Sequence, residues 1–145
     1  MSGMRHKGYL VTRTNRCVEI FPNTTVKASG KLSKFVLRFR NVDPRYVKIW
    51  GEESQMYLCM TENGKIYGNA TYEKNCRFIL HKRPYNYLAF YRKVATRKLF
   101  IGFSRSGKPR PGNVKNKRTH FSWKRIRRTT TPSPWNLLQK IWEAP

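Results

Sequence analysis

The sequence predicts an all-β protein in which one short structural unit occurs three times. The first observation is a period, because Phe35, Phe78 and Phe121 recur every 43 residues, each within a short run of strand-forming residues. The second is a pair of segments with the same offset, 57–65 and 100–108, which both read as an apolar strand, a polar turn ending in glycine, and a lysine. A looser copy of that pattern covers residues 9–15. Three strand-like copies predict a closed threefold β structure.

Short strands separated by turn residues account for most of the chain. Turn signals such as Pro22-Asn23, Asn63-Gly64 and Ser106-Gly107 divide the apolar runs. Strands of about five residues at this spacing are typical of an all-β barrel or sandwich, and no segment of this region keeps a helical apolar period. The expected strands are 9–13, 16–21, 25–27, 34–40, 45–50, 56–60, 65–68, 77–81, 87–92, 98–104 and 119–123.

The chain divides into three parts. Residues 1–7 form a short basic arm, residues 8–126 form the β domain, and the composition changes at residue 127 to a basic and then Thr/Pro-rich linker. Ser133 and Pro134 offer an N-cap and a first helical residue, so that 134–142 is predicted as a short helix with its tryptophans on one side. This tail either docks on the barrel or binds a partner.

The charge indicates the class of partner. The formal net charge is +24, from 31 basic and 7 acidic residues. Such an excess repels itself in a compact protein, which favours a polyanionic partner: nucleic acid, sulfated polysaccharide or an anionic membrane surface. No stretch is long and apolar enough for membrane insertion.

The three cysteines leave two possibilities open. Cys17, Cys59 and Cys76 have no CxxC spacing, which argues against zinc, and their number excludes a framework of several disulfides. Either one bridge or three buried thiols remain, and Cys59, in mid-strand among apolar neighbours, is interpreted as a small buried hydrophobe.

Catalysis is not expected. His6, His81 and His120 are dispersed, the seven acidic residues show no pairing that suggests acid–base catalysis, and no nucleophile-elbow or P-loop motif is present. We therefore predict a protein that is not an enzyme and that has neither a cofactor nor a metal site.

One stretch resembles a known signature. Gly64-Lys65-Ile66-Tyr67-Gly68 is followed, after six residues, by Asn75-Cys76-Arg77-Phe78-Ile79-Leu80, and after six more by Tyr87. This resembles the signature of the fibroblast growth factors, with Asn75 in the place of an acidic residue and Leu80 in the place of a glutamate. The resemblance covers about 8–126 and implies a β-trefoil fold. It also implies a secreted ligand that activates a receptor tyrosine kinase through its ectodomain, with heparan sulfate (heparin) as co-ligand.

The resemblance and the charge together indicate a heparin-binding loop. The segment 108–118 is stiffened by Pro109 and Pro111 and rich in cations, and Arg can form forked contacts with sulfate groups. The first lobe's turn lies beside it in the family. The predicted heparin-binding residues are Arg13, Asn15, Lys108, Arg110, Lys115, Lys117 and Arg118. Lys124, Arg125, Arg127 and Arg128 either enlarge this patch or attract a different partner.

The resemblance also implies receptor contacts. The predicted contact residues are Tyr9, Leu10, Asn86, Tyr87 and Trp123. Phe90 is either a core residue or a further contact. The family's glutamate contacts the receptor, and that contact is missing at Leu80.

Localisation is predicted to be extracellular. Asn23-Thr24-Thr25 and Asn69-Ala70-Thr71 are N-glycosylation sequons. The N-terminus lacks the apolar region of a signal peptide, so we expect a signal that is removed or not included in this chain. The alternative is an intracellular homologous-factor-like or nucleic-acid-binding trefoil protein without receptor activation.

Overall fold

The computed structural model describes residues 6–30, 36–42 and 44–126. Most of the basic arm, Phe35 of the period and the linker and tail from residue 127 onward, with the predicted helix at 134–142, lie outside these residues. The named strands pair antiparallel throughout. In the part of the chain that is described, no helix is long and apolar enough to cross a membrane.

The regular elements are short strands with three single-turn 3₁₀ helices. The strands are β1 (His6–Thr12), β2 (Cys17–Ile20), β3 (Val26–Ser29), β4 (Leu37–Asn41), β5 (Val47–Gly51), β6 (Met56–Met60), β7 (Ile66–Asn69), β8 (Ile79–Lys82), β9 (Leu88–Val94), β10 (Arg97–Phe100) and β11 (Phe121–Arg125). The 3₁₀ helices are η1 (Lys74–Cys76), η2 (Pro84–Asn86) and η3 (Lys117–Thr119).

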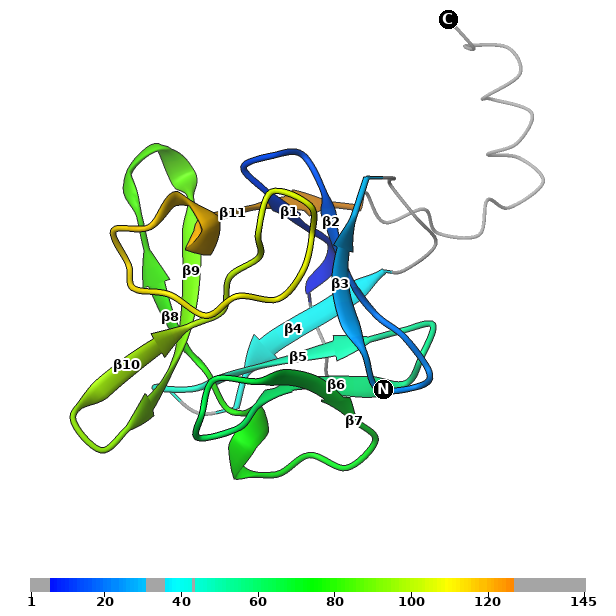
Figure 1. The fold of residues 1–145 in the computed structure, drawn as a ribbon. Coiled ribbons are helices and arrows are strands. Elements are labelled where there is room, and N and C mark those ends of the chain that lie inside the picture. Colours follow the sequence, from blue (N-terminus) through cyan, green and yellow to red (C-terminus); the bar gives the residue numbers. More distant parts are fainter. Residues whose placement is uncertain (1–5, 31–35, 43, 127–145) are drawn as a thin grey trace, which may run out of the picture.

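Six of the strands close into a barrel (Figure 1). β1 pairs with β4 and β11, β4 pairs with β5, and β9 pairs with β8 and β11. The ring is completed between β5 and the residue before β8, where Val47 N donates to Phe78 O at 2.8 Å and Phe78 N donates to Val47 O at 3.0 Å.

Three hairpins extend from this barrel, one in each lobe. We call β1–β4 lobe 1, β5–β8 lobe 2 and β9–β11 lobe 3. The hairpins are β2–β3, β6–β7, and β10 with the following segment, where Phe100 bridges Gly112 and Phe103 bridges Pro109. A barrel with three such hairpins is a β-trefoil, and the predicted fold class is confirmed.

The same five-residue turn ends each hairpin. Its segments are 21–25, 61–65 and 104–108, and in each the first residue's N–H donates to the fifth residue's carbonyl at 2.7–2.9 Å. The fourth residue has a positive φ, which is 74° at Thr24, 90° at Gly64 and 93° at Gly107. The lobe 1 copy of the repeat is therefore 21–25 and not 9–15. The 9–15 assignment was wrong because the turn at Thr12–Arg16 has similar chemistry but connects β1 to β2.

Each hairpin turn packs against an adjacent lobe. In two of the three cases a backbone hydrogen bond joins the turn to that lobe, and in the third the donor N–H is absent. Gly68 N donates to Thr24 O at 2.7 Å, and Ala28 N donates to Gly107 O at 2.9 Å. The position equivalent to Gly68 and Ala28 in lobe 3 is Pro111, which has no N–H. Its ring instead lies against Gly64, where an added Cβ would be 2.9 Å from Pro111 Cγ.

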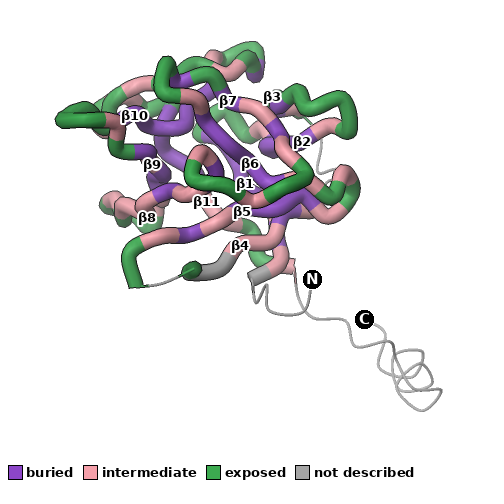
Figure 2. Tube along the Cα trace, turned by 90° about the horizontal axis from the view of Figure 1, so that it is seen from below, coloured by how far each residue is buried: buried purple, intermediate pink, exposed green. Residues whose placement is uncertain are grey.

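The barrel interior holds the main core. Phe78 and Phe121, two members of the 43-residue period, are both 0% exposed, and so is Phe90, which settles its assignment as a core residue. Figure 2 shows buried residues along the strands and exposed residues at the turns. The two described members of the period thus mark equivalent inward-facing positions in lobes 2 and 3.

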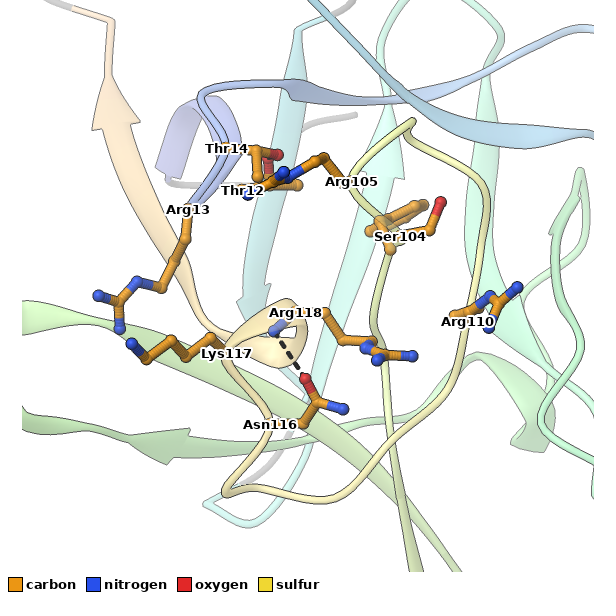
Figure 3. Close-up of a pocket in the computed structure, with 10 residues that line it drawn as sticks. Thr12, Arg13, Thr14, Ser104, Arg105, Arg110, Asn116, Lys117 and Arg118 are labelled. Carbon is orange, nitrogen blue, oxygen red and sulfur yellow. Dashed lines mark hydrogen bonds between the residues drawn. The ribbon is translucent and has the colours of Figure 1, made fainter.

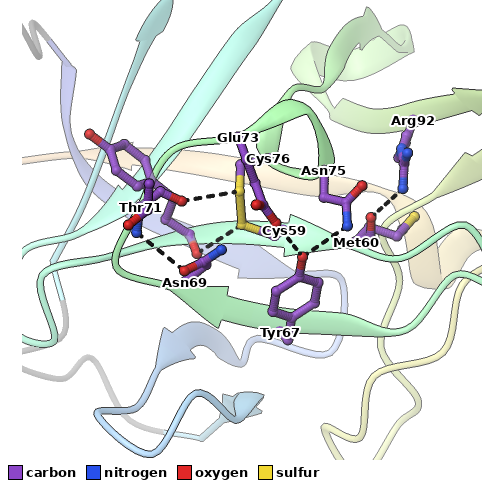
Figure 4. The surroundings of a disulfide bond; sticks show 10 residues. Cys59, Met60, Tyr67, Asn69, Thr71, Glu73, Asn75, Cys76 and Arg92 are labelled. Atoms are coloured by element: carbon purple, nitrogen blue, oxygen red, sulfur yellow. Dashed lines mark hydrogen bonds between the residues drawn. A yellow bond between two sulfur atoms is a disulfide. The ribbon is translucent and has the colours of Figure 1, made fainter.

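A second, smaller core lies in lobe 2 around a disulfide. Cys59 of β6 is bonded to Cys76 of η1 (Figure 4). The pair packs with Trp50, Tyr57 and neighbouring tyrosines. The expectation for Cys59 was right about burial but wrong about its chemistry, because the antiparallel return of the chain brings Cys76 onto it. Cys17 is buried in β2 and is not part of this bond.

Candidate polyanion-binding site

Two segments that are far apart in sequence bring cations together. The β1–β2 turn presents Arg13, because Asn15 adopts a φ of 65° and Thr12 N donates to Arg16 O at 2.8 Å. The other segment is the long return from β10 to β11, which carries the 104–108 turn and η3.

Asparagine side chains shape the second half of that return. Asn113 Oδ1 accepts the N–H of Lys115 at 3.0 Å, and Asn116 Oδ1 accepts the N–H of Arg118 at 3.1 Å. Asx turns of this kind fold the backbone locally without a strand ladder. The buried ring of His120 contacts Val114 O through Nε2 at 2.6 Å, which anchors the loop to the barrel. As a result, Lys115, Lys117 and Arg118 are exposed.

The two segments enclose a pocket of about 280 Å³, which we call the cationic pocket (Figure 3). In Figure 3, Arg13 and Lys117 lie on one side of it and Arg110 on the other. None of the described residues that line it is acidic. Its lining residues are Thr12, Arg13, Thr14, Phe103, Ser104, Arg105, Arg110, Asn116, Lys117 and Arg118.

Most of the predicted heparin-binding residues meet here. Arg13, Arg110, Lys117 and Arg118 line the cationic pocket. Lys108 and Lys115 are exposed on the same return without lining it, and Asn15 is exposed in the β1–β2 turn, where its positive φ shapes the backbone.

Arg105 is a lining residue that the sequence prediction missed. The available signal was its place between Phe103 and Gly107, at the tip of the repeated turn. A side chain at the tip of a hairpin turn is exposed to solvent, so a basic residue there could have been predicted as part of the charged surface.

The predicted receptor contacts are divided between surface and core. Tyr9 is half-buried in β1. Leu10 is 1% exposed and belongs to the core, which corrects its assignment as a surface contact: its side chain points into the barrel. Trp123 is half-buried and packs edge-on against Phe39 with ring centroids 4.6 Å apart, so most of its surface is used inside the protein.

The β8–β9 hairpin carries the most exposed aromatic residue described. Tyr85 is 93% exposed, and it and Asn86 have φ values of 61° and 64°. Two consecutive positive φ values define a tight hairpin turn that fixes the direction of both side chains. Tyr85 was not predicted. The predicted Asn86 is exposed, and Tyr87 is half-buried beneath Arg13, whose guanidinium carbon lies 4.5 Å from the ring centroid.

The two departures from the signature have structural roles. Leu80 is partly buried against the main core and pairs with Phe90 across β8 and β9. Asn75 Nδ2 donates to the hydroxyl of Tyr67 at 3.0 Å, and that hydroxyl donates to Glu73 Oε1 at 3.0 Å (Figure 4). Burial raises the pKa of the Tyr67 hydroxyl and the Glu73 carboxylate acts in the same direction, whereas the Asn75 hydrogen bond opposes them. An amide at position 75 thus joins a network in which the acid is Glu73.

The two predicted glycosylation sites lie near each other. Asn23 Oδ1 accepts the N–H of Thr25 at 3.1 Å, and Asn69 Oδ1 accepts the N–H of Thr71 at 3.2 Å. The hydrogen bond from Gly68 N to Thr24 O joins the two segments. Attachment of glycans stays a prediction.

The fold and the pocket define a β-trefoil protein with a cationic surface site. A sequence model of the fibroblast growth factor family matches residues 6–123. The chain belongs to the fibroblast growth factor family. This family consists of signalling growth factors and not of enzymes.

Individual relatives are moderately similar to this chain. Protein let-756 of Caenorhabditis elegans is 34% identical over 137 residues, which cover 81% of this chain and 32% of that protein. Human fibroblast growth factor 17 is 30% identical over 115 residues, with 77% of this chain and 52% of the relative covered. Human fibroblast growth factor 4 is 33% identical over 89 residues, with coverages of 59% and 43%. The chain spans about a third to a half of the length of these relatives.

Proposed function

We propose that this protein is a secreted growth factor that binds and activates a receptor tyrosine kinase of the fibroblast growth factor type, with heparan sulfate as co-ligand. The observation that carries the proposal is the cationic pocket, whose lining contains five Arg or Lys side chains and no acid. Such an arrangement is electrostatically unfavourable by itself and favourable around sulfate groups, which arginine contacts in a forked geometry. A polysaccharide that binds both ligand and receptors concentrates them on a membrane.

The disulfide supports the extracellular part of the proposal. Bonds such as Cys59–Cys76 form and persist in oxidising compartments and are rare in the cytosol. The two sequons agree with the same compartment.

Removing three pocket charges is expected to weaken heparin binding about tenfold at physiological salt and to lower the slope of log Kd against log salt by about 2–3. The variant is Arg105→Gln with Lys117→Gln and Arg118→Gln. These side chains are exposed or line the pocket, so the fold is retained. Affinity is measured by surface plasmon resonance on immobilised heparin over a salt series.

The matched control removes the same charge elsewhere. Lys65→Gln with Lys93→Gln and Arg97→Gln alters three exposed cations outside the pocket lining. We expect only a small change from it. Equal losses in both variants would mean that heparin is held by diffuse charge, and the pocket would not be the site.

The receptor side of the proposal rests on the β8–β9 hairpin. An exposed tyrosine on a rigid turn loses little conformational entropy on binding and is a typical anchor of an interface. Tyr85 has this position, with Asn86 and Tyr87 beside it. Because Leu80 stands where the family has a receptor-contacting glutamate, we expect the tip of the β8–β9 hairpin to contribute more of the receptor affinity in this protein.

The Tyr85→Ala variant is expected to raise the concentration needed for half-maximal receptor phosphorylation about tenfold, since loss of an anchor costs more than 1 kcal/mol. The assay applies the protein to cells that each express one receptor of this type, with and without heparin. Val42→Ala, at the other exposed large hydrophobic residue of the described part of the chain, is the control and should change little. Absence of phosphorylation for every receptor under both conditions would contradict the proposal and favour the homologous-factor-like or nucleic-acid-binding alternative, which the apolar Leu80 also favours.

A further inference from the structure

We infer that Tyr87 is a positioning residue of the cationic pocket: its ring holds the Arg13 side chain where a sulfate group of the polysaccharide binds. The inference rests on the proposed function, because it concerns the same pocket and the same class of ligand. It gives the β8–β9 hairpin a part in polysaccharide binding, which is separate from its proposed contact with the receptor.

Tyr87 contacts both of the segments that enclose the cationic pocket. From the β1–β2 turn, the guanidinium carbon of Arg13 lies 4.5 Å from the centroid of the Tyr87 ring. From the end of the β10–β11 return, the ring of His120 lies 6.2 Å from the Tyr87 ring, centroid to centroid, with the two planes inclined by 32°. Tyr87 belongs to neither segment, because it directly follows η2. Its ring therefore sets the position of Arg13 relative to Lys117 and Arg118, which the return carries.

The Tyr87 ring is itself held by its surroundings. Arg83 N donates to Tyr87 O at 2.7 Å, and Tyr87 N donates to Pro84 O at 3.3 Å, so both backbone polar groups of Tyr87 are bonded within the hairpin. The His120 ring that it contacts is buried and is bonded to Val114 O. Tyr87 is half-buried as a result. The ring is thus a fixed support for the guanidinium above it.

Arg13 needs such a support because its surroundings are positive. The described lining of the pocket contains five Arg or Lys side chains and no acid, and Arg13 lies on the same side of the pocket as Lys117 (Figure 3). Repulsion between like charges favours arginine conformations that point away from the pocket. In the described part of the chain, the ion pairs are those of Glu52 with Lys7 and Arg38, so no carboxylate there holds Arg13. The ring supplies the attraction instead.

A ring holds the guanidinium without using its hydrogen-bond donors. A cation over a ring is attracted by the electrons of the ring face, and it keeps its charge. The five N–H donors of an arginine lie in the guanidinium plane and remain free for other acceptors. A carboxylate partner would take up to two of these donors and would cancel the charge. Arg13 therefore keeps both its charge and its donors for a forked contact with sulfate.

The test measures the affinity of the full chain for a heparin hexasaccharide by isothermal titration over a salt series. Tyr87→Leu should weaken binding about threefold to fivefold, which corresponds to one cation–π contact. It should also lower the slope of log Kd against log salt by up to about 1. Leucine removes no charge, so a smaller slope reports that Arg13 has left the bound polyanion. Tyr87→Phe keeps the ring and should restore both the affinity and the slope.

A double-mutant cycle tests whether Tyr87 acts through Arg13. In an Arg13→Gln background, Tyr87→Leu should change the affinity by less than about twofold, because no cation is left for the ring to hold. The same threefold to fivefold loss in both backgrounds would overturn the inference.

The matched control is Tyr91→Leu. Tyr91 of β9 is half-buried like Tyr87, and Lys98 Nζ lies 5.1 Å from the centroid of its ring, but neither Tyr91 nor Lys98 lines the pocket. We expect this variant to lower the melting temperature without changing the affinity for the hexasaccharide or the slope. Equal losses of affinity in Tyr91→Leu and Tyr87→Leu would mean that both act through general destabilisation, which would overturn the inference.

A measurement on the wild type needs no variant to fold. The ring current of Tyr87 should shift the δ-methylene protons of Arg13 upfield in the nuclear magnetic resonance spectrum, both in the free protein and in the complex with the hexasaccharide. Unshifted protons in the complex would overturn the inference and leave the proposed function intact. No binding of the hexasaccharide by the wild type would instead overturn the proposed co-ligand, and the role of Tyr87 with it.

Discussion

A Gly107→Ala variant is expected to lose about 3 kcal/mol of unfolding free energy, from a left-handed backbone that alanine resists and from a broken buried hydrogen bond. Gly107 has a φ of 93°, and a Cβ there would overlap the carbonyl oxygen of Ala28. To make room, the turn has to move away from β3, which breaks the hydrogen bond from Ala28 N to Gly107 O. Urea unfolding followed by tryptophan fluorescence measures the difference.

Gly30→Ala is the control for this variant. Among the described residues, its added Cβ would meet nothing closer than Arg16 Nη1 at 4.0 Å, so we expect a change within about 0.5 kcal/mol. Equal stability of the Gly107→Ala protein and the wild type would mean that the turn does not hold lobes 1 and 3 together in solution.

Loss of the Cys59–Cys76 disulfide is expected to lower the unfolding free energy by about 3 kcal/mol, given a separation of 17 residues, because the bond restricts the unfolded chain. In the folded protein, the substitutions should disturb only the small core of lobe 2, since both cysteines belong to it. A Cys59→Ala and Cys76→Ala double variant, compared with the wild type in urea, gives the value.

Reduction provides the control for the disulfide. Dithiothreitol should lower the melting temperature of the wild type toward that of the double variant and leave the double variant unchanged. A wild type that is insensitive to the reductant, with its thiols found free by alkylation and mass spectrometry, would refute the bond.

The sequence was sufficient to predict the fold because the residues that carry the 43-residue period are core residues. Phe78 and Phe121 occupy equivalent inward positions, and a 43-residue spacing between such positions leaves few alternatives to a threefold barrel. The assignment of 9–15 as the first copy failed because turn chemistry is local. The Thr12–Arg16 and Phe21–Thr25 turns use the same hydrogen bonds, and only strand pairing decides which one matches lobes 2 and 3.

The part of the candidate site that lies on the β10–β11 return was predictable, because the composition of that segment alone indicates an exposed, basic loop. Arg110, Lys117 and Arg118 lie on a polar return with prolines and asparagines, and no fold would bury them together. Leu10 was assigned wrongly because its role was carried over from the family resemblance, and the apolar run Leu10-Val11 does not reveal from sequence that both side chains are buried. Arg105 and Tyr85 were missed because their prominence comes from turn geometry.

The disulfide depended on contacts that a sequence does not contain. Cys59 and Cys76 are brought together by the return of the chain through β7 and η1, and their spacing matches no short motif. A mid-strand cysteine among apolar neighbours looks the same whether or not a second cysteine lies above it.

Pro111 leaves the return from β10 to β11 with one backbone hydrogen bond to the adjacent lobe fewer than the equivalent segments of lobes 1 and 2. In lobes 1 and 2, the equivalent residues Ala28 and Gly68 tie the hairpin to the adjacent lobe through a backbone hydrogen bond, so a length change there would cost the barrel a contact. Pro111 makes no such bond, and beyond it the return is shaped by the side chains of Asn113 and Asn116. Charge changes at the exposed side chains of this return, such as Lys115, Lys117 and Arg118, can therefore accumulate with little penalty to folding. A lineage carrying this protein is free to change the charge pattern of this surface while its scaffold stays constant.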